Sequence, residues 1–212
     1  MVRQILEYRQ VMKNTFYINP NMRLQTDTFV LVWQAVPENV LAQGANMFPK
    51  EDCYIEKKKC VCFHTQVDEV FSIYYLSSAV FERPRFQSWL RNAVKEAVII
   101  RGNQVLPVEL HNVEKRVGLY SKSVAIKKLR KAYGNCNYIN GHINFHTMLV
   151  LLPWGIREEV IIHELCHFKV HGHSKKFWDL LTEKLGRDSQ MSKLSTDLFY
   201  SRYHDQISWL MK

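Results

Sequence analysis

"EEVIIHELCHFKVHGHSKKFW", residues 158–178, contains four histidines within eleven positions: His163, His167, His171 and His173. Imidazole nitrogens are common zinc ligands, and a catalytic zinc ion takes three protein ligands and keeps its fourth position for water. If this segment holds a catalytic metal, at least one of the four histidines is not a ligand.

The first two of these histidines lie four residues apart, with Glu164 between them. On a helix their rings project from one face about a turn apart, so both can reach one ion. Glu164 lies about 100° further round the helix, where its carboxylate can reach metal-bound water. This H-E-x-x-H arrangement is typical of metal-assisted hydrolysis with the glutamate as general base. Apolar residues surround most of the helix predicted after Pro153, which indicates that it is buried.

The third ligand requires a turn in the chain. His171 lies eight residues from His163, roughly 12 Å along a helix axis, so three ligands on one straight stripe cannot converge. Gly172 tolerates the left-handed backbone that would end the helix. We therefore predict His173 as the third ligand and His171 as a helix-end or solvent histidine. The other candidates are carboxylates of the following helix, Asp179 and Glu183.

Two alternatives remain for the cluster as a whole: a structural zinc site and a set of hydrogen-bonded core histidines. A structural site normally completes its coordination with a fourth cysteine or histidine. Cys166 is adjacent to His167 in sequence but points about 100° away from it on a helix. We therefore favour a catalytic site.

The composition is that of an ordinary globular protein, with 212 residues, 47% hydrophobic and 23% charged. No apolar run approaches the roughly 18 residues of a membrane-spanning helix. The N-terminus lacks the apolar core of a secretory signal, and the five cysteines are an odd number. We therefore expect reduced thiols, a cytoplasmic location and no membrane partner.

The hydrophobic periodicity changes along the chain. Runs such as "TFVLVW" (28–33) and "FSIYYL" (71–76) predict a strand-rich N-terminal region. Apolar residues at helical spacing then predict a helix from Pro84 to Gly102, and a second helix after Pro107. Further predicted elements are a strand near 123–129, a turn at 140–141, the strand "HINF" (142–145), and helices after Pro153, over 174–185 and over 194–210. The mixture indicates an α+β fold.

The residues from about 84 to 185 resemble the YgjP-like metallopeptidases, relatives of the SprT and WLM zinc proteases. "HELCHFKVHGHSKKFW" is similar to that family's H-E-L-x-H … N-H-S-x-x-F-W segment, with Gly172 where Asn is commoner. "IKKLRKAYGNCN … GHINFHTMLVLLP" (126–153) is similar to its basic strand, W-G-S-C block, I-N-L strand and L-P, with Tyr133-Gly134-Asn135-Cys136 replacing W-G-S-C. Metzincins share the histidine spacing, but Val170 occupies the position of their glycine.

The resemblance implies a zincin-like fold and a zinc-dependent peptidase acting on a peptide or protein. It implies one zinc ion per chain held by His163, His167 and His173, with Glu164 as catalytic base and no further cofactor. We expect a strand-rich region over 1–82, a zincin-like catalytic domain over 83–188 and a C-terminal helix over 189–212. The substrate is expected to lie along the "HINF" strand by strand addition.

Two other functions remain open, and a basic segment is relevant to them. Residues 122–131, here called the basic segment, carry five lysines and arginines and no acid in a chain of net charge +9. This composition suits either a solvated strand face or a phosphate-rich partner such as nucleic acid. One alternative is a zinc-dependent nucleotide or phosphate-ester hydrolase, which the basic segment would suit. The other is a SprT-like nucleic-acid-associated protease, which the resemblance to SprT suggests.

Other side chains could contribute to function. Cys60, Cys62 and His64 alternate along a predicted strand and, with Cys53, could bind a second zinc ion. Cys136 is expected to be a small core residue. The group that stabilises a tetrahedral oxyanion has several candidates: Tyr133, His146, Tyr200, Tyr203 and His204.

Overall fold

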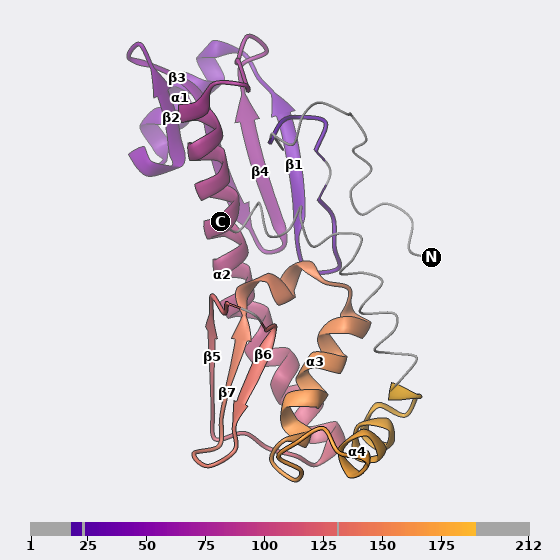
Figure 1. Cartoon of the computed structure of the whole chain (residues 1–212). Helices are drawn as coiled ribbons and strands as arrows, with labels where there is room; N and C mark the ends of the chain where they lie inside the picture. The colour runs from indigo at the N-terminus through magenta and orange to yellow at the C-terminus, as the bar shows by residue number, and fades with distance from the viewer. Residues whose placement is uncertain (1–17, 23, 131, 190–212) are drawn as a thin grey trace. The chain divides into compact units, whose positions relative to one another are not determined.

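The computed structural model describes residues 18–22, 24–130 and 132–189 (Figure 1). Within these residues the fold is mixed α/β, with two sheets and four α-helices. The chain divides into two compact units, one up to Ala97 and the other from Val98. The division therefore falls inside a helix, and each unit is described by itself below. The predicted C-terminal helix and the predicted region 189–212 lie outside the described residues, apart from Ser189.

The first unit consists of a four-stranded sheet, helix α1 and the first part of α2 (Pro84–Val117). Its elements are β1 (Val30–Ala35), α1 (Glu38–Met47), the 3-10 turn η1 (Lys50–Asp52), β2 (Cys53–Glu56), β3 (Lys59–Val67) and β4 (Val70–Tyr75). The strand order is β1-β4-β3-β2, with β1 parallel to β4 and the other pairs antiparallel. The strands predicted from 28–33 and 71–76 correspond to β1 and β4.

Helix α1 was not expected from the sequence. A Cβ on Gly44 would lie only 2.6 Å from the Phe63 ring, so the glycine lets α1 approach β3 closely. Leu41 of α1 is fully buried with Cys53, Cys60 and Phe63. Packing against the sheet therefore supports a helix whose own sequence signal is weak.

Helix α2 runs without interruption over Pro84–Val117, and the predicted break at Gly102 is wrong. A Cβ on Gly102 would lie 3.4 Å from the backbone oxygen of Thr147, so this glycine allows close approach and does not end the helix. Pro107 lies inside the helix, where it costs about 3 kcal/mol. Residues on both sides of it are buried, and their packing offsets that cost. The helix ends at Gly118, which has a φ of 71°.

The second unit has a three-stranded sheet of β5 (Ser123–Lys127), β6 (Gly134–Asn137) and β7 (His142–His146). Its order is β5-β7-β6, with β7 parallel to β5 and antiparallel to β6. The "HINF" strand is therefore central and pairs on both sides, and the expectation that substrate adds to it is wrong. The edge strands of this sheet are β5 and β6.

Two helices follow the sheet: α3 (Trp154–Cys166), after the 3-10 turn η2 (Thr147–Leu151), and α4 (Lys175–Leu185). Helix α3 begins directly after Pro153 and is largely buried, as its apolar circumference predicted. Ser174 occupies the N-cap of α4, without a side-chain cap hydrogen bond. No helix of the described residues is long and apolar enough to cross a membrane.

A buried ion pair anchors α3 to the second half of α2. Arg157 is 1% exposed, and its guanidinium donates to both carboxylate oxygens of Glu109 at 2.5 and 3.0 Å. The same guanidinium also donates to the backbone oxygen of Leu152. Two hydrogen bonds to one carboxylate fix both distance and orientation, which holds the N-terminal half of α3 in a defined position.

Candidate metal centre

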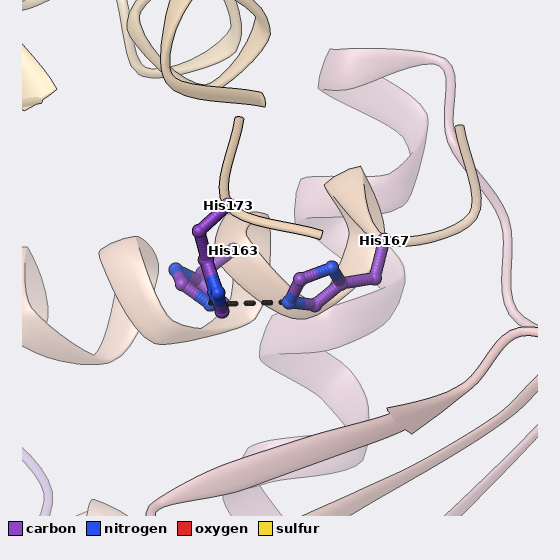
Figure 2. A group of neighbouring side chains, drawn as sticks. All are labelled: His163, His167 and His173. Atoms are coloured by element: carbon purple, nitrogen blue, oxygen red, sulfur yellow. Dashed lines mark hydrogen bonds between the residues drawn. The ribbon is translucent and has the colours of Figure 1, made fainter. Parts of the chain in front are cut away.

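Three imidazole rings converge at the C-terminal end of α3. The Nε2 atom of His163 lies 3.2 Å from Nε2 of His167 and 3.0 Å from Nε2 of His173. Figure 2 shows the three rings pointing toward a common centre: His163 lies in α3, His167 directly after its last residue, and His173 in the segment that follows. This is the only group of three or more metal-ligating side chains with such spacing among the residues that the structure describes.

The separations suit a tetrahedral ion. Ligand nitrogens about 2.0–2.1 Å from zinc lie about 3.3 Å from one another in tetrahedral geometry. His163 Nε2 is close to both other nitrogens, and one ring N–H cannot donate to two partners in separate directions. Three lone pairs directed at a cation satisfy all three nitrogens. The donor set therefore fits a metal ion that prefers nitrogen, with room for a further ligand.

The chain leaves the helix earlier than expected. Helix α3 ends at Cys166, His167 is its C-cap, and the amides of Lys169 and Val170 donate to the Cys166 oxygen. Left-handed glycines occur at 118, 141 and 186, so the prediction of a left-handed turn at Gly172 is wrong. The turn starts at His167, five residues before the glycine, because the C-terminal carbonyl of α3 is satisfied there. This early exit gives the segment enough length to bring His173 back to His163.

Hydrogen bonds orient the histidines on either side of this turn. Nδ1 of His167 lies 3.2 Å from the backbone oxygen of Val170. As an N–H donor to that carbonyl, Nδ1 leaves the Nε2 lone pair directed at the centre. Trp178 donates its ring N–H to the backbone oxygen of His173 at 3.1 Å, which ties the segment to α4.

Phe177 supports all three rings from α4. It is fully buried, and its ring centroid lies 4.8, 4.7 and 4.8 Å from those of His163, His167 and His173. Sequence analysis did not identify Phe177 or Trp178 as site residues. The F-W pair in the quoted family segment was the available signal.

Glu164 lies beside the histidines and faces β6. Its side chain is buried, and burial raises the pKa of its carboxyl to about 8. A Cβ on Gly134 would lie 2.7 Å from Cγ and 2.8 Å from Oε1 of Glu164. The glycine of the Tyr-Gly-Asn-Cys block is therefore required for the glutamate to occupy this position. Burial, with a contribution from Glu164, also raises the pKa of the Cys136 thiol to about 11.

A cleft of ≈ 530 Å³ opens over these residues. It is bordered on one side by the β6 edge and on the other by α3 and the segment after it. The lining residues are Ala132, Tyr133, Gly134, Asn135, Cys136, Tyr138, Glu159, Val160, His163, Glu164, His167, His171 and His173. The arrangement combines a nitrogen-rich metal position, a buried carboxyl group and an edge strand along one open groove.

Several other predicted residues are not part of the group. Asp179 pairs with Lys175 at 2.8 Å and Glu183 with Lys184 at 3.0 Å. Cys53, Cys60 and Cys62 are buried free thiols of the first unit, and they do not form a metal-ligating group with His64 in the described residues.

The oxyanion candidates divide into two sets. Tyr133 lines the cleft, with its ring 6.1 Å from the buried His146. The Nδ1 atom of His146 accepts the Met148 amide at 3.0 Å. Tyr200, Tyr203 and His204 lie outside the described residues.

The basic segment follows the opposite edge of the sheet, along and beyond β5. Lys122, Lys127, Lys128 and Arg130 are exposed and make no ion pair within the described part of the chain. Lys131 is not among the described residues. Because β5 and β6 are separated by β7, the cationic edge and the cleft edge are different edges of the same sheet.

Comparison with known proteins identifies the domain. Residues 43–193 match the family model described as YgjP-like, metallopeptidase domain. Among solved structures, the crystal structure of the metallopeptidase zymogen of Pyrococcus abyssi abylysin is similar, with a TM-score of 0.41 and 19% sequence identity. The match covers 47% of this chain and 96% of that one. A comparison with curated proteins finds no significant match.

Proposed function

This chain belongs to the YgjP-like metallopeptidase family, and we propose that it is a zinc-dependent peptidase with a zincin-like catalytic domain. Membership of the family implies a metal cofactor. We propose one zinc ion per chain, with His163, His167 and His173 as its ligands. The observation that carries the proposal is the convergence of these imidazoles at 3.0 and 3.2 Å beside a buried carboxyl group.

Zinc in such a site acts as a Lewis acid and lowers the pKa of a coordinated water to about 7. The residues of the chain perform the proton transfers. Glu164 accepts a proton from the attacking water and later delivers it to the departing amine nitrogen. Burial raises the pKa of this carboxyl to about 8, so its carboxylate form is a stronger proton acceptor than an exposed carboxylate. Phe177 and the Val170 carbonyl keep the histidine rings oriented.

We propose that the substrate is an extended peptide bound at the β6 edge. Strand β6 pairs with β7 on one side, and residues 134–136 line the cleft on the other. A peptide added as a further strand would form main-chain hydrogen bonds with β6. Its scissile carbonyl would then lie over the groove that contains Glu164 and the three histidines. Main-chain recognition of this kind favours broad acceptance of peptide sequences.

Metal content and hydrolysis test the proposal. Purified protein should contain one zinc per chain by elemental analysis and should cleave casein or quenched fluorescent peptides. A chelator should abolish cleavage, and stoichiometric zinc should restore it. Protein with no zinc, or with two equivalents, would contradict the site as proposed, and two equivalents would direct attention to the N-terminal cysteines.

The basic segment supports a second candidate, a nucleic-acid-associated protease. Its four described cations lie along one edge of the sheet without acidic partners in the described residues, which suits a phosphate-rich partner. Binding of DNA or RNA should then weaken steeply as salt increases. If DNA and RNA do not bind even at low salt, the basic segment is a solvated strand face and this second candidate is excluded. A phosphate-ester hydrolase would instead cleave nucleoside triphosphates and spare casein. The cytoplasmic location predicted from the cysteines stays a prediction.

A further inference from the structure

One pair of aromatic rings in the second unit is packed more closely than any other in the described residues. The ring centroids of Tyr138 and His171 lie 3.7 Å apart, and the ring planes differ by 10°. Aromatic pairs more often have centroids 4.5–7 Å apart. Both residues are exposed and both line the cleft. Such a stacked pair joins the two backbone segments that carry the rings.

The Tyr138 side of this pair is a rigid turn. Tyr138 begins the turn between β6 and β7. The Asn137 side chain accepts hydrogen bonds from the amides of Ile139 and Asn140 at 3.2 and 3.3 Å. Gly141 then adopts a φ of 74°, and its oxygen accepts the Lys122 amide at 2.8 Å. These hydrogen bonds hold the turn in one conformation, so Tyr138 has a defined position against which His171 can pack.

The His171 side is a segment that lacks regular structure. It lies between two of the proposed ligands, His167 and His173, after the end of α3 and before α4. Hydrogen bonds hold its two ends, at the Val170 oxygen and at the His173 oxygen. At Gly172 a Cβ would meet nothing within 4 Å. The ring of His171 joins the middle of the segment to the turn that follows β6.

We propose that the Tyr138–His171 stack is a clasp that positions His173, so that both stacked residues are positioning residues for the metal centre. The inference rests on the proposed zinc site. It adds a physical reason why His173, the third proposed ligand, lies close to the other two. His171 acts through its ring face, which Tyr138 covers, and its ring nitrogens are not in the group formed by the other three histidines. Both stacked residues also line the cleft.

The test separates stacking from coordination at position 171. His171→Phe keeps an aromatic ring and removes both nitrogens, His171→Ala removes the ring, and Tyr138→Ala removes its partner. Zinc affinity is measured by competition with a chromophoric chelator, and amide hydrogen exchange of residues 168–174 is measured on the metal-free protein. An aromatic pair contributes enough to shift such equilibria by about 2- to 10-fold. Both alanine variants should lose that much affinity and exchange faster by a similar factor.

Two further results define the clasp. His171→Phe should stay close to wild type in both measurements, and the double alanine variant should be no worse than either single one, because each removes the same contact. If His171→Phe loses zinc as strongly as His171→Ala, the imidazole coordinates the metal and the proposal is wrong. Unchanged affinity and exchange in every variant would also refute it.

Failure of the proposed function would look different from failure of the clasp. A wild-type protein that takes up no zinc refutes the zinc site, and with it the role of the stack in ligand positioning. Zinc uptake by wild type with no effect of the alanine variants refutes the clasp alone. Hydrogen exchange of residues 168–174 does not need zinc, so comparing the metal-free wild type with the alanine variants tests the stack separately from the zinc site.

Discussion

The contact between Gly134 and Glu164 allows the glutamate to be displaced without touching a histidine. An alanine Cβ at position 134 would lie 2.7 Å from Glu164 Cγ, about 0.7 Å short of an ordinary contact of 3.4 Å. Gly134 lies in a strand and does not have a positive φ, so alanine suits its backbone and the clash is confined to the side chain. The glutamate must therefore move by about 0.7 Å or more, or β6 must shift.

We expect Gly134→Ala to lower kcat by about 100-fold, the loss that a misplacement of about 1 Å can cause in an oriented catalytic group. Zinc affinity should stay within about 2-fold of wild type, because the three atoms nearest to the new Cβ all belong to Glu164 and not to a proposed ligand. Overpacking should also destabilise the fold by about 1–3 kcal/mol. The assay is steady-state cleavage of a quenched fluorescent peptide, with zinc content and urea unfolding measured on the same samples.

Two controls make the result specific. Gly155→Ala is the same substitution on α3, where the nearest atom to the new Cβ is 4.0 Å away, and it should leave activity unchanged. In a Glu164→Gln background, Gly134→Ala should cause little additional loss, because the base is already absent. Activity near wild type in a folded, zinc-loaded Gly134→Ala protein would refute the view that this glycine sets the position of the glutamate.

Three further predictions concern single side chains. Glu164→Gln should fold and bind zinc like wild type but lose at least about 100-fold in hydrolysis, and equal activity in the two proteins would exclude Glu164 as the base. His173→Ala should weaken zinc binding far more than His171→Ala in the chelator assay; comparable losses would argue that the ligand assignment is wrong. Glu109→Ala should destabilise the protein by about 3–5 kcal/mol in urea, because Arg157 is left charged and buried without its partner. If Glu109→Ala lowers the free energy of unfolding by less than about 1 kcal/mol, water must solvate the Arg157 guanidinium in the variant.

The sequence by itself predicted the features that depend on local spacing. The interval of four between His163 and His167 decides which rings share a helix face, whatever surrounds the helix. The strands at 28–33, 71–76 and 142–145 followed from short apolar runs between turn residues. The axial distance to His171 excluded it from a straight stripe, and His173 is the histidine that lies with the other two. The family resemblance was likewise readable from motif letters, and residues 43–193 match that family.

Tertiary structure decided the features that depend on residues distant in sequence. Gly102 and Pro107 are local signals for a helix end, yet α2 continues through both because packing on its two sides outweighs their cost. Whether "HINF" is an edge or a central strand depends on pairing with β5 and β6, which no property of its own residues specifies. The exit from α3 at Cys166, the support by Phe177 and the stack on Tyr138 also arise between segments. Such contacts form only when the chain is folded, since their energies depend on distances that sequence spacing does not fix.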